Sequence, residues 1–135
     1  MRIALAQINP TVGDLDGNRK KIAEYIERAK SLEADIVVFP ELAICGYPPE
    51  DLLYKEHFVK ENLKVRKALI AATRGVYHAR YTPAATAPAI TTVIGFVDMD
   101  KQKNLYNAAA IIQNGQLKGV IRKHDLPNYE AIRLG

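Results

Sequence analysis

The chain has 135 residues, of which 48% are hydrophobic and 25% are charged, and its net charge is +4. That length allows a single domain with a sizeable core, and its mild charge, with Lys and Arg interleaved with Glu, argues against a nucleic-acid partner. No window approaches the roughly 20 apolar residues of a membrane helix, so no membrane contact is expected. The first residues lack the pattern of a signal peptide, and a single cysteine allows no intrachain disulfide. Together these features predict a cytoplasmic protein.

The first part of the chain predicts a strand, a helix and a second strand. In residues 2–10 both alternating rows are nearly apolar, which suits a strand covered on both faces. A helix is predicted over 18–32, with Asp14 or Asp16 as its cap. Residues 34–41, "ADIVVFPE", form a short β-branched strand. A strand–helix–strand order predicts parallel pairing through a crossover. The apolar residues of the helix recur at helical spacing: Ile22, Ile26, Ala29 and Leu32.

The second part predicts another helix and three further strands. Residues 58–73 have one apolar helical face, and "TTVIGFVD", 91–98, reads as a strand. Two apolar segments within 105–123 are joined by Asn114-Gly115, which supplies the two positive φ angles of a type I′ hairpin turn. The predicted fold class is therefore α/β, with one mixed sheet and two helices on one of its faces. The predicted helical face consists of Phe58, Val59, Leu63, Arg66, Leu69, Ile70 and Thr73.

Two segments do not fit this pattern. Residues 76–88, "VYHARYTPAATAP", are rich in Ala, Thr and Pro and have no clean period, so we interpret them as a loop insertion. The last six residues, "EAIRLG", follow a strand and a loop with nothing left to cover them. Since an open sheet leaves an edge and an uncovered face, we expect residues 1–135 to be a partial domain of a larger fold.

Glu41 is the first candidate for chemistry. It follows "VVFP" at the C-terminal end of a strand, where α/β folds commonly place catalytic groups. Half-burial at that position would raise its pKa and suit it to general acid–base catalysis. The alternative is a glutamate that simply ends the strand in solvent.

Lys123 closes the last predicted strand in "GVIRKHDLPNY". A lysine so placed could stabilise an anionic intermediate or pair with a carboxylate, although a lone lysine is more commonly a solvated surface charge. If the two strands that they close are neighbours, Glu41 and Lys123 would meet at one edge of the sheet.

Cys45 is a weaker candidate. A reactive thiol needs an electropositive, partly exposed site, and "ICGYPP" offers no nearby base except Glu41, so a small buried hydrophobe is the favoured interpretation. The histidines show no metal-ligand spacing, and no Gly-rich nucleotide loop occurs, so neither a metal nor a nucleotide site is expected. The histidines are His57, His78 and His124.

Several stretches, taken in order, resemble a known family. They are "RIALAQINPTVGDLDGN", "VVFPELAICGYPPEDLL", "TTVIGFVD", "LYNAAAIIQNGQLKGVIRK" and "KHDLPNY". The chain resembles the carbon–nitrogen hydrolase (nitrilase) superfamily, and within it the N-terminal glutaminase domains of bacterial glutamine-dependent NAD synthetases. "FPEL" and the lysine are shared across the superfamily, whereas "PELAICGYPPEDLL" and "K-x-x-LPNY" are typical of the synthetase branch. The resemblance leaves out 76–88 and the last six residues.

The resemblance implies an αββα sandwich and a Glu-Lys-Cys triad that hydrolyses an amide. It assigns Glu41 as the general base, Lys123 as the group that holds the tetrahedral intermediate, and Tyr47 and Tyr129 as neighbours of a glutamine pocket. In the family the nucleophilic cysteine lies well downstream of the lysine. The resemblance therefore implies a chain truncated before its nucleophile, with Cys45 as a bystander.

The same resemblance implies further partners. This domain would need no cofactor, whereas ATP and deamido-NAD would bind to a synthetase domain that accepts the ammonia. We expect the 135 residues alone to be inactive on glutamine, and homo-oligomers are expected. Two alternatives stay open: a non-catalytic interaction or oligomerisation module with a nitrilase-derived fold, and another nitrilase-type amidase such as a carbamoylase. The "LPNY" and "GYPPEDLL" stretches argue against the last, by resemblance only.

Overall fold

The structure is a computed structural model that describes residues 1–74 and 89–124. The predicted insertion at 76–88 and the last six residues lie outside the described residues. In the described part, no helix is long and apolar enough to cross a membrane. The elements, in chain order, are β1 (Ile3–Leu5), α1 (Leu15–Ser31), β2 (Ile36–Val38), η1 (Glu50–Tyr54), α2 (Glu56–Ala72), β3 (Thr91–Met99), β4 (Leu105–Gln113) and β5 (Gln116–Arg122).

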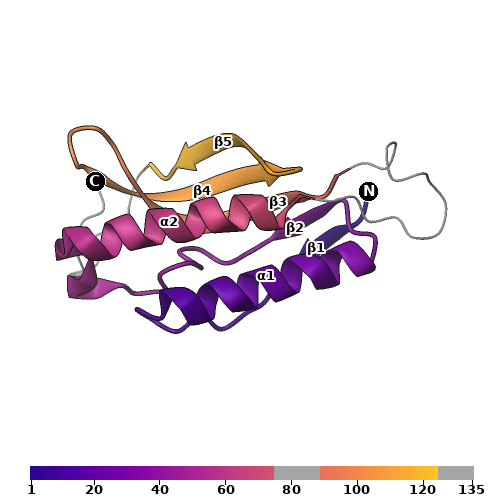
Figure 1. Cartoon of the computed structure of the whole chain (residues 1–135), viewed down its shortest axis with the longest axis horizontal. Helices are drawn as coiled ribbons and strands as arrows, with labels where there is room; N and C mark the ends of the chain where they lie inside the picture. Colours follow the sequence, from indigo (N-terminus) through magenta and orange to yellow (C-terminus); the bar gives the residue numbers. More distant parts are fainter. Residues whose placement is uncertain (75–88, 125–135) are drawn as a thin grey trace.

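The strands form one mixed sheet in the order β1-β2-β3-β4-β5. β1, β2 and β3 are parallel neighbours, whereas β4 and β5 run antiparallel to their neighbours. Helix α1 makes the predicted crossover between β1 and β2. Figure 1 shows α1 and α2 side by side along the same side of the sheet. The predicted α/β class, with one mixed sheet and two helices on one face, is confirmed.

Helix α1 begins at Leu15, earlier than the predicted start at residue 18. Asp14 is the cap: its side chain accepts a hydrogen bond from the Gly17 backbone N at 2.9 Å, which satisfies one of the free N–H groups at the helix start. Leu32 was expected on the apolar face, and this prediction is wrong. It lies past the last helical turn, and 63% of it is exposed. The predicted burial is confirmed for Ile22, Ile26 and Ala29.

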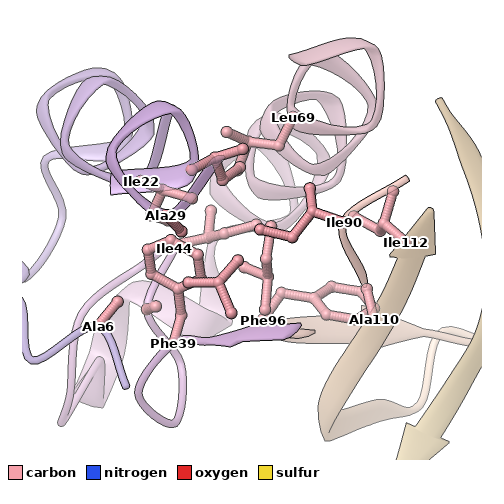
Figure 2. Close-up of a cluster of buried hydrophobic side chains, with 14 of the residues drawn as sticks. Ala6, Ile22, Ala29, Phe39, Ile44, Leu69, Ile90, Phe96, Ala110 and Ile112 are labelled. Carbon is pink, nitrogen blue, oxygen red and sulfur yellow. The ribbon is translucent and has the colours of Figure 1, made fainter. Parts of the chain in front are cut away.

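The core lies between the two helices and the sheet face that they cover (Figure 2). Ile22 of α1 and Leu69 of α2 belong to the same cluster as Ile94 and Phe96 of β3. All four side chains are at most 1% exposed. Successive side chains of a strand point to opposite faces, so this row of β3 identifies the helix-covered face. Burying these side chains takes their apolar surface out of water, and this transfer is the main driving force for folding.

The turn between β4 and β5 has the predicted geometry. Asn114 and Gly115 adopt φ of 48° and 72°, as both central residues of a type I′ turn require. The Gly115 backbone N donates to Thr73 Oγ1 at 2.8 Å, so the hairpin turn is tied to the C-terminal end of α2. Thr73 had been predicted on the buried face of that helix, and it is fully buried.

The other face of the sheet carries apolar side chains that no described helix covers. Ile3 and Leu5 of β1 are 52% and 71% exposed, and Ile121 of β5 is 61% exposed. The prediction that residues 2–10 form a strand covered on both faces is therefore wrong for the described residues. Only three of them form a strand, at the edge of the sheet, and the helices cover only one face. We call this surface the helix-free face.

Candidate active site

Glu41 lies on an arch of backbone that follows β2. The Phe39 backbone N donates to Val93 O at 2.9 Å, and the Ile44 backbone N donates to Gly95 O at 3.2 Å. The chain thus keeps its pairing with β3 before and after the arch, while residues 40–43 bulge out between these two hydrogen bonds. The arch therefore has fixed ends, and Glu41 projects from its middle.

Gly95 makes room for this arch. A Cβ atom at this position would lie 2.4 Å from Pro40 O and 2.5 Å from Leu42 N, which is closer than side-chain atoms approach backbone. Gly95 belongs to the opposite row of β3 from Ile94 and Phe96, so the arch crosses β3 on the helix-free face. A glycine is needed here because two backbone segments touch.

Asn18 anchors the far end of the arch. This fully buried residue donates from Nδ2 to Ile44 O at 3.0 Å and to Thr11 O at 2.8 Å, and its Oδ1 accepts from the Thr11 backbone N at 2.8 Å. These bonds tie the arch to the loop before α1. Asn18 was not identified from the sequence. The feature that could have identified it is its position, since it is a polar residue on the same helical face as Ile22 and Ile26.

Lys123 directly follows β5, an edge strand of the sheet. Its backbone N donates to Asn107 O at 2.8 Å, which continues the β4–β5 pairing by one position. Its Nζ donates to Glu41 Oε1 at 2.9 Å. Asn107, in β4, donates from its side-chain Nδ2 to the same Oε1. The three side chains therefore meet on the helix-free face. Asn107 was missed from the sequence, where its only signal was a polar residue within an apolar strand.

Glu41 and Lys123 meet as predicted, but the strands that they follow are not neighbours, so the expected reason for their meeting is wrong. Glu41 follows β2 and Lys123 follows β5, and these strands are separated by β3 and β4. The pair forms because the arch carries Glu41 across β3 at Gly95, toward Asn107. Position at the ends of strands therefore brings the two charges together only with the help of this glycine.

The pKa of Glu41 is lowered, not raised as expected from half-burial. The hydrogen bond from Lys123 is the largest cause, burial opposes it, and the hydrogen bond from Asn107 lowers the pKa further. The Glu41 side chain is 46% exposed and that of Lys123 is 42% exposed, so desolvation is too weak to reverse the sign. Glu41 is therefore a carboxylate at neutral pH, the form that can accept a proton.

Cys45 is buried, as predicted. It is 0% exposed and packs with Leu42, Leu53, Val59 and Val97. Burial raises the pKa of its thiol to about 12, so almost none of it is thiolate at neutral pH. Its environment is that of a core side chain.

The remaining predicted site residues are only partly described. Tyr47 is 56% exposed and lies just after the arch, whereas Tyr129 lies outside the described residues. In the described ranges, no three His, Cys, Asp or Glu side chains are grouped so that they could hold a metal ion.

Comparison with known protein families gives one match over almost the entire chain. The model of the carbon-nitrogen hydrolase family matches residues 2–134. A glutamine-dependent NAD(+) synthetase from Thermotoga maritima is 41% identical over 129 residues, which is 96% of this chain and 20% of that protein. The enzyme of the same name from Aquifex aeolicus is 40% identical over 131 residues, 97% of this chain and 20% of that protein. The chain thus spans about a fifth of the length of these relatives.

Solved structures give the same result. Glutamine-dependent NAD+ synthetase from Acinetobacter baumannii, solved with ADP, superposes with a TM-score of 0.79 at 37% identity, covering 94% of this chain and 21% of that one. An amidase from Nesterenkonia sp. superposes with a TM-score of 0.79 at 22% identity, covering 100% of this chain and 48% of that one. The second likeness shows a shared fold.

Proposed function

The chain belongs to the carbon–nitrogen hydrolase family, and from that premise we propose that it is the glutaminase portion of a glutamine-dependent NAD synthetase. In this role it would help to release ammonia from the side-chain amide of glutamine, for amidation of deamido-NAD. The observation that carries the proposal is the Glu41–Lys123 ion pair, 2.9 Å between Oε1 and Nζ, on the helix-free face. The two relatives that match at 41% and 40% identity bear that enzyme's name.

The pair has the chemistry that amide hydrolysis needs. Glu41, ionised at neutral pH, would take the proton from an attacking thiol and deliver it to the departing ammonia. Lys123 would stabilise the negative charge that develops on the amide oxygen as the tetrahedral intermediate forms. Collapse of the intermediate would expel the ammonia and leave a thioester on the thiol, which water would then cleave to glutamate and the free thiol, with Glu41 again as the base. Tyr47 and Tyr129 would lie at the mouth of the glutamine pocket.

The thiol itself is proposed to come from outside these 135 residues. Cys45 is the only cysteine in the sequence, and its complete burial keeps it from any substrate. We therefore expect the purified chain to release no ammonia from glutamine. Activity of the chain alone that disappears in Cys45→Ala would overturn this assignment.

A chimaera tests the proposed function directly. This chain would replace the matching segment of the Thermotoga maritima relative, which would supply the rest of the enzyme. We expect the chimaera to form NAD from deamido-NAD and ATP with glutamine as the nitrogen source. A chimaera that uses free ammonia but not glutamine would contradict the proposal, because the synthetase part would then be intact and the glutaminase part not.

We also propose that the helix-free face packs against a second sheet layer, contributed by further residues of the same protein or by another copy of the chain. The exposed Ile3 and Leu5 of β1 and Ile121 of β5 support this, because these large apolar side chains stand on the same uncovered face, at the two edge strands of the sheet. The same observation favours the second candidate, a non-catalytic oligomerisation module. A chimaera that hydrolyses glutamine would exclude the purely non-catalytic role.

A further inference from the structure

Asn107 contacts both members of the Glu41–Lys123 pair. Its backbone O accepts from the Lys123 backbone N at 2.8 Å, and its side-chain Nδ2 donates to Glu41 Oε1. It lies within β4, opposite Val97 of β3, and is 7% exposed. One buried residue therefore sets the position of the lysine through its main chain and that of the glutamate through its side chain.

Both hydrogen bonds to Glu41 end on the same oxygen. Lys123 Nζ lies 2.9 Å from Oε1, and Asn107 Nδ2 donates to that atom as well. Within the described part of the chain, no hydrogen bond reaches Oε2. A carboxylate held at one oxygen by donors from two directions loses rotational freedom, while its second oxygen keeps its lone pairs available to a proton.

An amide suits this position better than a second charge. Lys123 brings its charge on a long, flexible stem that is 42% exposed, so it sets the orientation of the carboxylate only loosely. Asn107 has a short side chain fixed by a buried strand, and its neutral N–H donor orients Glu41 without placing a second cation beside the carboxylate, although its hydrogen bond also lowers the pKa of Glu41.

We propose that Asn107 is a positioning residue that fixes the Glu41 carboxylate through Oε1, so that Oε2 is presented for proton transfer to and from an amide substrate. The inference rests on the proposed function for the proton transfer. The positioning itself can be tested without catalysis.

The first test is an NMR titration of the 135-residue chain. The Glu41 carboxyl carbon and the Asn107 side-chain amide would be assigned with Glu41→Gln and Asn107→Ala. We expect the Asn107 amide signals to shift with the same midpoint as the Glu41 carboxyl. In Asn107→Ala, and in the isosteric Asn107→Asp, the pKa of Glu41 should rise. Lys123, the charged side chain that bonds to Glu41 in the described residues, is kept in every variant.

Asn104→Ala is the matched control. Asn104 donates from Nδ2 to Asp100 Oδ2 at 2.9 Å, so the variant removes the same kind of amide–carboxylate bond in the same hairpin. It should raise the pKa of Asp100 and leave that of Glu41 unchanged. The inference is wrong if the Asn107 amide ignores the titration of Glu41, or if Asn107→Ala and Asn104→Ala move the Glu41 midpoint equally.

The second test uses the chimaera with the Thermotoga maritima relative. Asn107→Ala should lower kcat for glutamine by about 10- to 100-fold with a smaller change in KM, because a misplaced base weakens proton transfer more than binding. An unchanged kcat would contradict the inference. A chimaera without any glutamine hydrolysis would refute the proposed function, and the titration would still decide whether Asn107 positions Glu41.

Discussion

Glu41 carries its charge beside an ammonium group that lies 82 positions further along the chain. The hydrogen bond from Lys123 is the main reason why its pKa lies below the usual value of 4.5. A folded-state pKa below the unfolded one means that the pair stabilises the fold fully above about pH 4.5. This contribution is lost as the pH falls through the folded pKa. Because both side chains are more than a third exposed, solvent screening keeps the contribution small.

Lys123→Met is expected to raise the pKa of Glu41, because it removes the donor that favours the ionised form. A carboxyl-carbon NMR titration measures this directly. Unfolding by urea between about pH 6 and pH 3 should show a smaller acid-dependent loss of stability in the variant than in the original chain. Lys118→Met, which removes an exposed charge from β5, is the control. An unaltered Glu41 pKa in Lys123→Met would contradict the ion pair.

Cys45 should react slowly with thiol reagents in the folded chain. A pKa of about 12 leaves only about one thiolate in 10⁴ at pH 8, and complete burial blocks access. Iodoacetamide labelling followed by mass spectrometry measures the rate, with the urea-unfolded chain as the control. Equal rates in the two states would show that the thiol is accessible and reopen its role.

The arch between β2 and β3 is the element that makes the site. Its ends are paired with β3, and the backbone of its middle lies against Gly95, where a Cβ atom would otherwise stand. Asn18 ties it to the loop before α1. None of these contacts involves the side chain of Glu41. The arch thus fixes the backbone position of Glu41 by main-chain packing, and the side chain of Glu41 remains available to bind Lys123 and Asn107.

Gly95→Ala adds only one methyl group, but it should displace the arch and so lower stability and disturb the position of Glu41. The added methyl group would lie 2.4 Å from Pro40 O, and such overpacking costs about 1–3 kcal/mol. Urea unfolding measures the loss, and the pKa of Glu41 should return toward its ordinary value as the arch shifts. Gly119→Ala is the matched control, because a Cβ atom there has no neighbour within 4 Å in the described structure. Equal stability of the two variants would contradict the account of the arch.

The elements were largely predictable from sequence because they depend on local patterns. Apolar spacing located α1 and α2, and Asn114-Gly115 specified its turn. The arch was not predictable, since it depends on Gly95, which is distant in sequence from Glu41 and meets it only after the sheet has formed. The direction of the Glu41 pKa shift was missed for the same reason: burial can be guessed from a strand end, but hydrogen-bonding partners on other strands cannot.

At the scale of the whole molecule, the described residues form one helical layer and one sheet, with the candidate site on the helix-free face. The αββα arrangement implied by the resemblance would place a second sheet against that face. Such a cover would bury the exposed apolar side chains and would also remove water from around the Glu41–Lys123 pair, which strengthens electrostatic interactions.

Without a cover, the chain is expected to self-associate through the helix-free face. Sedimentation at several concentrations should show a rising average mass, and Leu5→Lys should reduce it, because it places a charge on a side chain that is 71% exposed. Leu32→Lys is the control: Leu32 is 63% exposed but lies at the end of α1. Monomers at all concentrations, or equal effects of the two variants, would contradict this use of the face.

Glu41→Gln in the chimaera gives the most direct measurement of the central claim that this carboxylate is the base of an amide-hydrolysing site. The quantity to measure is the rate of NAD formation with glutamine divided by the rate with free ammonia, with Glu24→Gln, an exposed helical carboxylate, as the control. We predict that the ratio falls by about 10²-fold or more in Glu41→Gln, in line with the loss of general base catalysis, and stays unchanged in Glu24→Gln. A ratio in Glu41→Gln equal to that of the unmodified chimaera would contradict the account.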